Sequence, residues 1–421
     1  MGYVFKSDIS SSEFNAFVKT HSFAPITQTE AWGKVKIDWS KRYCGIYDEN
    51  GTMCGGALLL VRSLAPMFKL AYCPRGPIFD LSNSELFETF ISGVKNFAKK
   101  NGIYSVKIDP PVPLKITPPE LDESEYFTPF SKEISESVSD YIFNAGFSYK
   151  ELSLVLNDYI QPRFNMIVPL AKKNGEKLST ADFKKHFKSS ERKYMGAFSV
   201  NRGMFFEEAE ITDENIDLFA DIMKSTGERK SIFLRNREYF KRLLLSFGDS
   251  AKLFFEKTDI DIYIKYLNDR KAKETEDEKV KTEELLAAAE KVKMERGQVI
   301  PLSVSVVIMP PNEEGVRMAE YLYAGSDLRV LPQFSGADVM LSEIMKYCAD
   351  KNCQLLNLGG VEGSLDDGLY AFKSKFNPIL AEYIGEFDIV INKLKYNFVE
   401  KNLPWAARIY RRLVSFIKKE K

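Results

Sequence analysis

A basic and aromatic segment late in the chain is the first place where residue types suggest chemistry. The pair Gly359–Gly360 lets the backbone turn sharply or lie close to a ligand, because glycine lacks a Cβ. The run Gly368–Phe376 follows, with Phe372 beside Lys373. A lysine partly withdrawn from water next to an aromatic face can act on developing charge. The alternative is a solvated lysine at the end of a helix, with Lys375 close by.

Three phenols and one carboxylate are further candidates. Tyr321 and Tyr323 alternate in a predicted strand, where side chains repeat every two residues, so both are predicted to face the same side. They and Tyr104 could bind a ligand through their hydroxyls, whereas simple half-buried packing is the more ordinary role of a strand tyrosine. Asp109 closes a strand before two prolines, where a carboxylate is either a general base or a turn residue.

A second group of residues suits anionic oxygens. Arg235 and Tyr239 lie four residues apart and share one face if their segment is helical, and Lys36 lies one turn beyond Trp32. Arginine offers a planar fork of donors and lysine a point charge. Exposed helix charges and a tyrosine at the rim of the core are the plain alternatives.

Composition excludes several classes of protein. The 59 basic and 59 acidic residues cancel, so any contact with RNA must rest on local basic patches. The 5 cysteines contain no CxxC pair, which argues against a disulfide framework and against a zinc site, so no metal is predicted. No Gly-x-Ser-x-Gly nucleophile motif occurs. Without a signal peptide or an apolar run near the roughly 20 residues that span a bilayer, a cytoplasmic protein is predicted.

Helices and strands must alternate to position these residues. A strand at Tyr321–Ser326, a helix at Gly336–Asn352 and a strand at Asn357–Gly360 are predicted. The same order of helix and strand occurs earlier, with a helix predicted at Ser84–Lys100 and a strand at Ile103–Asp109. This repeat suggests a duplicated α/β domain. A further strand is predicted at Glu151–Leu156. The 421 residues fit two or three units of about 100–200 residues each.

Residues 259–298 have a different character. More than half of the residues after Asn268 are charged, and apolar residues recur at the spacings Ile260-Tyr263-Leu267 and Leu285-Ala288-Ala289-Val292. This pattern predicts an antiparallel two-helix coiled-coil arm that turns near Thr275–Glu278.

Five short segments occur in an order that resembles the FemABX family, the non-ribosomal peptidyltransferases that use aminoacyl-tRNA to extend the stem peptide of peptidoglycan precursors. The segments are Gln28–Lys36, Tyr72–Ile78, Lys107–Pro110, Arg235–Phe240 and Glu382–Asp388. The resemblance covers nearly the whole chain and implies an α/β (α+β) fold with two GNAT-like domains. The first would comprise residues 1–156 plus 384–421 and the second residues 157–383, with the arm inserted in the second.

The reaction that the resemblance implies is aminolysis. The side-chain amine of the third stem-peptide residue attacks the ester of an aminoacyl-tRNA, which requires positioning, removal of a proton and an oxyanion contact, but no cofactor. Lys373 would act on the developing charge or orient the acyl group, and Asp109 would be the general base or hold the amine. Lys36 and Arg235 would contact the diphosphate of the precursor. The predicted substrate-binding residues are Lys36, Tyr104, Arg235, Tyr239, Tyr321, Tyr323 and Phe372.

The partners implied are aminoacyl-tRNA and either UDP-MurNAc-pentapeptide or the lipid-linked precursor. The arm is often assigned to tRNA contact in the family, but its nine acids against eight bases between Asp269 and Arg296 fit a solvated spacer equally well. The C-terminal run Leu403–Lys421 is basic, with apolar residues at helical spacing. It either packs on the domain or contacts an anionic membrane, which would place the protein at the inner face of the membrane.

Two other functions are compatible with parts of the sequence. An acyl-CoA-dependent N-acyltransferase of the GNAT type would need a glycine-containing pyrophosphate loop of the Q/R-x-x-G-x-G/A kind, which is missing from the sequence. In a non-catalytic binding protein, Lys36, Arg235 and Lys373 would have no reason to converge.

Overall fold

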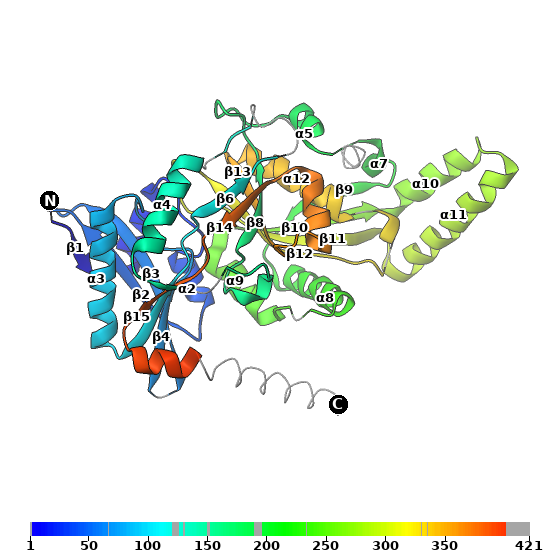
Figure 1. The fold of residues 1–421 in the computed structure, drawn as a ribbon. Coiled ribbons are helices and arrows are strands. Elements are labelled where there is room, and N and C mark those ends of the chain that lie inside the picture. Colours follow the sequence, from blue (N-terminus) through cyan, green and yellow to red (C-terminus); the bar gives the residue numbers. More distant parts are fainter. Residues whose placement is uncertain are drawn as a thin grey trace.

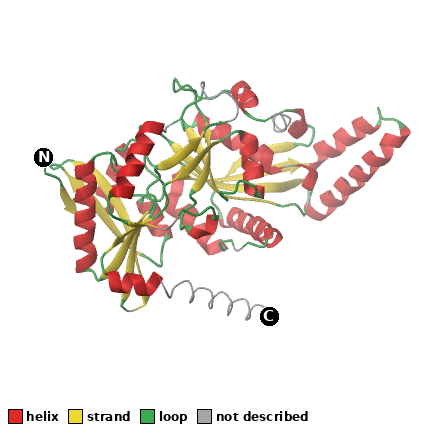
Figure 2. Cartoon of the chain, in the orientation of Figure 1, coloured by secondary structure: helices red, strands yellow, loops and turns green. Residues whose placement is uncertain are grey.

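The structure is a computed structural model that describes residues 2–65, 67–119, 126–128, 131–149, 152–188, 196–232, 234–329, 331–334 and 336–400. Two mixed β-sheets lie side by side, and a helical arm projects from the second (Figure 1). Figure 2 shows helices packed around the strands of both sheets. The predicted α/β class with an inserted two-helix arm is confirmed.

The first sheet has its strands in the order β1-β2-β3-β4-β5-β15-β7. Neighbouring strands are antiparallel except β4 and β5, which the helix α3 (Ser84–Lys100) connects as a parallel pair. The side chain of Asn83 caps α3, and the helix ends at Asn101 before Gly102, which has a φ of +66°. The strands are β1 (Val4–Lys6), β2 (Ser40–Tyr47), β3 (Met53–Ala65), β4 (Phe68–Cys73), β5 (Ile103–Ile108), β7 (Ser148–Tyr149) and β15 (Phe387–Val390).

The second sheet has the order β6-β14-β8-β13-β12-β11-β10-β9. Its parallel pair, β12 and β13, is connected by α12 (Gly336–Asp350), which confirms the predicted strand, helix and strand. The strands are β6 (Pro113–Thr117), β8 (Phe164–Pro169), β9 (Met204–Ala209), β10 (Ala251–Asp259), β11 (Val299–Ile308), β12 (Met318–Ser326), β13 (Leu355–Val361) and β14 (Ile379–Tyr383).

The remaining helices surround the two sheets or form the arm. They are α1 (Ser11–Thr20), α2 (Glu30–Val35), α4 (Lys132–Asn144), α5 (Thr180–His186), α7 (Ala197–Val200), α8 (Asp213–Lys230), α9 (Arg237–Phe247), α10 (Ile260–Lys271), α11 (Glu276–Arg296) and α13 (Gly368–Lys373). Short 3₁₀ turns occur at Leu156–Asp158, Gly248–Ser250, Pro332–Phe334 and Ser374–Phe376. The predicted domain boundaries stay a prediction. Strand β15 joins the first sheet and β6 joins the second.

One hydrophobic core joins the two sheets. Trp32 and Leu58 from the first unit and Phe240 and Val306 from the second belong to the same buried cluster, and α2 packs on α9 across the junction. Separate cores lie under α3 and α4 on the outer face of the first sheet and under α12 on the other face of the second. Because burial of apolar surface is the main stabilising term, the shared core fixes the two units against each other.

The arm consists of α10 and α11, and its predicted seam is largely buried. Tyr263, Leu267 and Ala289 are each no more than 2% exposed. Lys271 forms an ion pair with Glu283 across the seam at 2.6 Å. The turn lies slightly earlier than predicted, because Thr275 caps α11 in a capping box.

Two local predictions are wrong. The described part of Glu151–Leu156 is no strand, because its backbone runs as a loop into a 3₁₀ turn. Tyr321 and Tyr323 face opposite sides of the second sheet. The pairing of β12 with β11 shifts between Val306 and Val307, which leaves Leu322 as an extra residue and interrupts the two-residue repeat. The run Leu403–Lys421 lies outside the described residues. None of the helices in the described ranges is long and apolar enough to cross a bilayer.

Glu256 is a buried carboxyl group whose contacts do not favour its charged form. It lies on β10 beneath α12, is 0% exposed, and neither carboxylate oxygen has a hydrogen-bond partner among the described residues. Burial raises its pKa well above 4.5, and nearby Glu343 raises it further, whereas Lys346 opposes the shift. The folded protein therefore binds a proton that the unfolded chain releases once the pH rises above about 4.5.

We expect Glu256→Gln to make stability less dependent on pH. The wild type should lose up to about 1.4 kcal/mol of unfolding free energy, relative to the variant, for each pH unit above the unfolded pKa. Urea unfolding at pH 5, 6, 7 and 8 checks this, with Glu284→Gln at an exposed position of α11 as a control. Parallel stability curves for wild type and Glu256→Gln would show that Glu256 is charged in the folded state.

Candidate active site

A cluster of cations and phenols lies where α2 meets α9. The Lys36 ammonium is 4.2 Å from the centre of the Trp32 ring and 5.9 Å from that of Tyr239. The Arg235 guanidinium lies 5.0 Å from the Tyr239 ring centre, and the Tyr323 hydroxyl donates to the Tyr239 hydroxyl at 3.3 Å. The structure thus brings together four of the predicted site residues, Lys36, Arg235, Tyr239 and Tyr323.

Arg242 belongs to this cluster, although no prediction included it. Its guanidinium lies 5.7 Å from the Tyr239 ring centre, and its Nε donates to the Val35 carbonyl at 3.0 Å. Burial, followed by the charges of Arg235 and Arg242, lowers the pKa of Lys36 to about 8. Within the described part of the chain, none of these three cations forms an ion pair with a carboxylate. Their combined charge is suited to an anion with several oxygens, such as a diphosphate.

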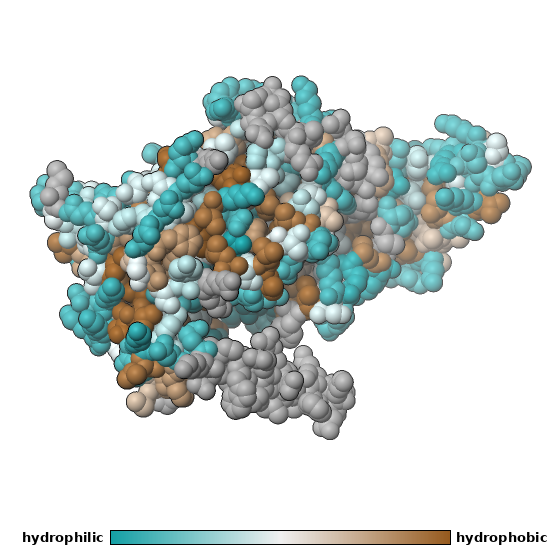
Figure 3. Space-filling view, in the orientation of Figure 1, coloured by the Kyte–Doolittle hydropathy of each residue, from teal (hydrophilic) through white to brown (hydrophobic). Residues whose placement is uncertain are grey.

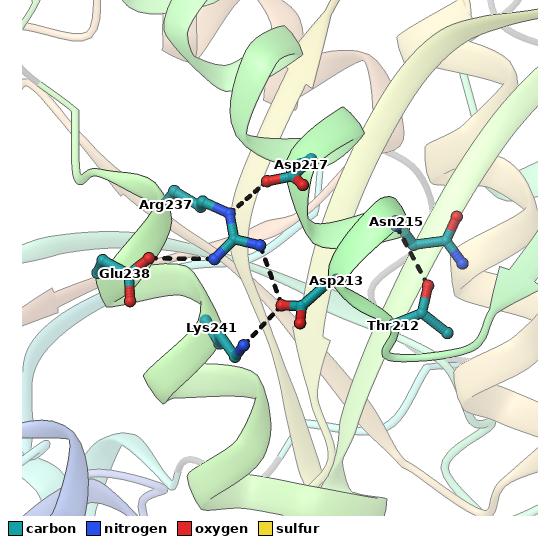
Figure 4. A network of polar contacts seen from close by, with 7 residues as sticks. All are labelled: Thr212, Asp213, Asn215, Asp217, Arg237, Glu238 and Lys241. Carbon is teal, nitrogen blue, oxygen red and sulfur yellow. Dashed lines mark hydrogen bonds and ion pairs between the residues drawn. The ribbon is translucent and has the colours of Figure 1, made fainter.

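Carboxylates on α8 hold the start of α9 in place. Arg237 donates to Asp213 on α8 at 3.0 Å and also forms an ion pair with Asp217, and Lys241 donates to Asp213 at 2.6 Å (Figure 4). The Asn236 side chain caps α9 by accepting from the Tyr239 backbone N–H. These ion pairs neutralise the charge of Arg237. Arg235, which precedes the helix, instead lies at the Tyr239 ring in the cluster at α2.

Lys373 is buried in a different place. It ends α13, is 7% exposed, and its ammonium donates to the Gly360 carbonyl at 2.8 Å. Burial lowers the pKa of Lys373 to about 8, against the opposing charge of Asp367. Gly359 has a φ of +79°, a conformation that favours glycine, and a Cβ on it would lie 3.8 Å from the Lys373 ammonium. The Gly-Gly pair thus lets the strand backbone approach the lysine.

The Phe372 ring makes no cation–π contact with the Lys373 ammonium, although the two residues are neighbours in the described helix α13. Its ring packs edge-to-face on Phe376 with centres 5.7 Å apart, and Lys375 lies over it at 5.5 Å. Its role as a substrate contact stays a prediction. The segment itself is the helix α13, with Asp367 as its cap.

Asp109 is a buried acceptor at the end of the first sheet. It is 1% exposed, and its two oxygens accept from the Tyr72 hydroxyl at 2.7 Å and the Arg75 backbone N–H at 2.6 Å. Burial raises the pKa of Asp109 to about 7, although Arg75 and Tyr72 favour its charged form. The carboxyl group therefore keeps its proton to a higher pH than an exposed aspartate does.

A short series of contacts connects Asp109 to Lys373 across the two sheets. Arg75, whose backbone binds Asp109, donates through its guanidinium to the Pro162 carbonyl at 2.5 Å. Pro162 packs directly on Gly360, which has no room for a Cβ there, and the Gly360 carbonyl accepts from Lys373. These contacts place the two predicted catalytic residues on either side of one junction between the sheets. Arg75 also lines a cavity of about 500 Å³, but neither Asp109 nor Lys373 is among the described residues that line it.

Glu320 is a candidate that residue spacing did not reveal. It lies on β12 three residues before Tyr323, and because Leu322 is bulged the two positions are only about 7 Å apart along the strand, with both side chains on the face that carries α8 and α9. Glu320 keeps partial exposure. Withdrawal of its carboxylate from water raises its pKa to about 7, although Asn357 and Arg75 favour the charged form. The sequence signal was only a carboxylate in the strand that carries Tyr321 and Tyr323.

The other two predicted tyrosines lie away from the cluster at α2. Tyr321 packs under α12 with the core of the second unit, on the opposite face from Tyr323. Tyr104 is 4% exposed, packs edge-to-face on Phe68, and burial raises its pKa to about 12. Both are core residues in this structure, and their roles as substrate contacts stay predictions.

Comparisons with known proteins agree over the whole length of the chain. The FemAB family model matches residues 9–285 and 268–401. A lipid II:glycine glycyltransferase of Staphylococcus epidermidis is 29% identical over 95% of this chain and 96% of its own. That of Staphylococcus aureus strain USA300 is 28% identical with the same coverage. The crystal structure of FemX is similar with a TM-score of 0.76 and 25% identity, over 95% of this chain and 100% of that one. The predicted fold of two GNAT-like domains agrees with this likeness.

Proposed function

This chain belongs to the FemAB family, and we propose that it transfers an amino acid from aminoacyl-tRNA to a peptidoglycan precursor. The acceptor is the side-chain amine of the stem peptide. The similar staphylococcal proteins carry the name of lipid II:glycine glycyltransferases, which supports a precursor of this class. The observation that supports the proposal most is the convergence of Lys36, Arg235 and Arg242, without carboxylate partners among the described residues, around Tyr239 and Tyr323.

The cluster at α2 takes the diphosphate of the precursor in this proposal. Two guanidinium groups supply directional donors, and the Lys36 ammonium supplies a point charge held over two aromatic rings. Tyr323 and Glu320 lie about 7 Å apart along the same face of β12. A diphosphate bound at Tyr239 therefore leaves the attached peptide room to extend towards the junction between Asp109 and Lys373. The predicted alternative of a non-catalytic binding protein gives no reason for Lys36, Arg235 and Lys373 to converge. Of these three, Lys36 and Arg235 lie together at Tyr239, whereas Lys373 lies apart from them on Gly360.

The chemical step forms one bond and breaks one. The amine nitrogen attacks the ester carbonyl carbon of the aminoacyl-tRNA, and the bond from that carbon to the ribose oxygen breaks. A carboxylate with a pKa of about 7, Glu320 or Asp109, accepts a proton from the attacking amine and passes it to the ribose oxygen, which leaves as a hydroxyl group. Lys373, with a pKa of about 8, is mostly protonated at neutral pH and stabilises the oxyanion.

A transfer assay tests the function directly. The purified chain is incubated with a panel of charged tRNAs and with either UDP-MurNAc-pentapeptide or the lipid-linked precursor, and the mass of the precursor is measured. We expect the mass of one amino acid to be added to at least one form. No transfer from any charged tRNA to either form would contradict the proposal.

Arg235→Ala should weaken use of the precursor. Loss of a charge-assisted contact worth about 1.5–3 kcal/mol corresponds to a fall in kcat/KM for the precursor of roughly 10- to 150-fold. The kinetic constants for aminoacyl-tRNA should hardly change. Arg329→Ala is a matched control, because its guanidinium is already paired with Asp327 and Asp221. Equal losses in the two variants would mean that Arg235 has no special contact with the precursor.

A further inference from the structure

One end of the first unit exposes a group of large apolar side chains. They come from the end of β3, from the turn between β3 and β4 and from the helical residues 393–400. The Lys395 ammonium donates to the Met67 carbonyl at 2.9 Å, and the Phe68 and Phe398 rings stack with centres 5.5 Å apart, so the two segments form one surface. The apolar tip consists of Leu64 (40% exposed), Met67 (67%), Leu394 (84%) and Phe398 (58%). Brown surface is visible in this region at the lower left of Figure 3.

A cationic hollow of about 680 Å³ lies next to the tip. Arg42, Arg62 and Lys69 line it, and Asp38 is the only acidic side chain among its described lining residues. Arg62 and Lys69 belong to the same β-hairpin as Leu64 and Met67. None of the three cations forms an ion pair with a carboxylate in the part of the chain that the structure describes. The hollow is therefore open to phosphate groups.

We propose that the apolar tip and the cationic hollow together dock this protein on an anionic lipid bilayer. Exposed apolar patches of this kind are typical of interaction surfaces. Apolar side chains enter the boundary between headgroups and acyl chains, while cations bind the headgroup phosphates. The charge of the hollow, three cations against one carboxylate, selects an anionic surface over a neutral one, and each basic residue strengthens such binding about fivefold.

The position of the hollow also suits the proposed substrate. Ile37, the residue after Lys36, lines the hollow and is 60% exposed. A protein docked through the tip would hold the cluster at α2 near the headgroup layer, where the diphosphate of a lipid-linked precursor lies. This link rests on the proposed function, whereas the docking itself does not.

Vesicle flotation with the full-length chain tests the docking without measuring activity. Vesicles of phosphatidylcholine alone are compared with vesicles containing about one third phosphatidylglycerol, a fraction that gives a strongly negative surface. We expect binding only to the second kind, weakened by 0.5 M salt because screening shortens to a few ångström. Inorganic phosphate at equal ionic strength should not displace the protein.

Two double variants separate the two halves of the surface. Met67→Glu with Leu394→Glu, and Arg62→Glu with Lys69→Glu, should each lower the affinity for anionic vesicles at least about tenfold. Two variants on the arm serve as controls. Met294→Glu matches the apolar double variant, because Met294 is 81% exposed and Met67 and Leu394 are similarly exposed, and the double variant Lys291→Glu with Arg296→Glu matches the cationic one. Both controls should leave the affinity for anionic vesicles within about twofold of the wild type. Thermal midpoints check that all variants fold.

Three outcomes would overturn the proposal. The first is no binding of the wild type to anionic vesicles. The second is binding that both double variants retain and that is lost on replacing Arg408, Arg411 and Arg412 with alanine, which would assign it to the run Leu403–Lys421. The third is a wild-type dimer in solution that Met67→Glu with Leu394→Glu converts to a monomer, because a second copy would then cover the tip.

Discussion

Lys373→Met is expected to lower kcat for amino-acid transfer about 100-fold or more, with KM for the precursor changed by less than about threefold. The reason is that a buried ammonium facing an oxyanion acts only as charge develops, so its loss affects the transition state rather than binding. In the structure this ammonium is 7% exposed and donates only to the Gly360 carbonyl among the described residues. A bound acyl group beside Gly359 would lie within its reach.

The pH dependence separates this role from a structural one. With a pKa of about 8, wild-type Lys373 loses its proton as the pH rises, so kcat should fall above pH about 8. Lys373→Arg, which keeps its charge, should remove that alkaline limb. Lys351→Met on the exposed end of α12 is the control and should retain wild-type kcat. If Lys373→Met instead lowers the thermal midpoint and keeps kcat, the residue serves only to hold Gly360.

Local signals predicted the elements that depend on local contacts. The helix at Ser84–Lys100 and the arm were predictable because caps, periodicity and charge pattern act within a few residues. The shared core between the sheets was not predictable, because Trp32 and Phe240 meet only through packing of α2 on α9. The bulge at Leu322 was missed for the same reason, since it depends on how β12 pairs with β11.

The residues of the site divide in the same way, into those that local sequence could reveal and those that depend on tertiary packing. Residue type together with the family resemblance selected Lys36 and Arg235, because both are cations that suit a diphosphate and both lie in segments that carry the resemblance. Arg242 was missed, since a third arginine on an amphipathic helix looks like an exposed charge until the fold turns it towards Tyr239. Glu320 was missed because its raised pKa comes from withdrawal from water, which depends on the neighbouring strands and on Arg75.

Two carboxyl groups, Glu320 and Asp109, have a pKa of about 7, and their surroundings favour Glu320 as the base. Asp109 is 1% exposed and both of its oxygens already accept hydrogen bonds, whereas Glu320 is only partly buried as a residue, although its carboxylate is withdrawn from water. A base must reach the amine that it deprotonates. We therefore expect Glu320→Gln to lower kcat by roughly 100- to 10,000-fold, the range that general-base catalysis supplies.

The acid limb of the pH profile decides between the two carboxyl groups. Wild-type kcat should rise with pH through about 7, as the base loses its proton, and Glu320→Gln should remove that rise. Asp109→Asn should keep the rise, because the amide can still accept from the Arg75 N–H and donate to the Tyr72 hydroxyl. If kcat of Asp109→Asn no longer rises with pH, and kcat of Glu320→Gln still rises as in the wild type, the base is Asp109. That result would require the junction to open when substrate binds, because the closed arrangement around Arg75 leaves Asp109 without access to an amine.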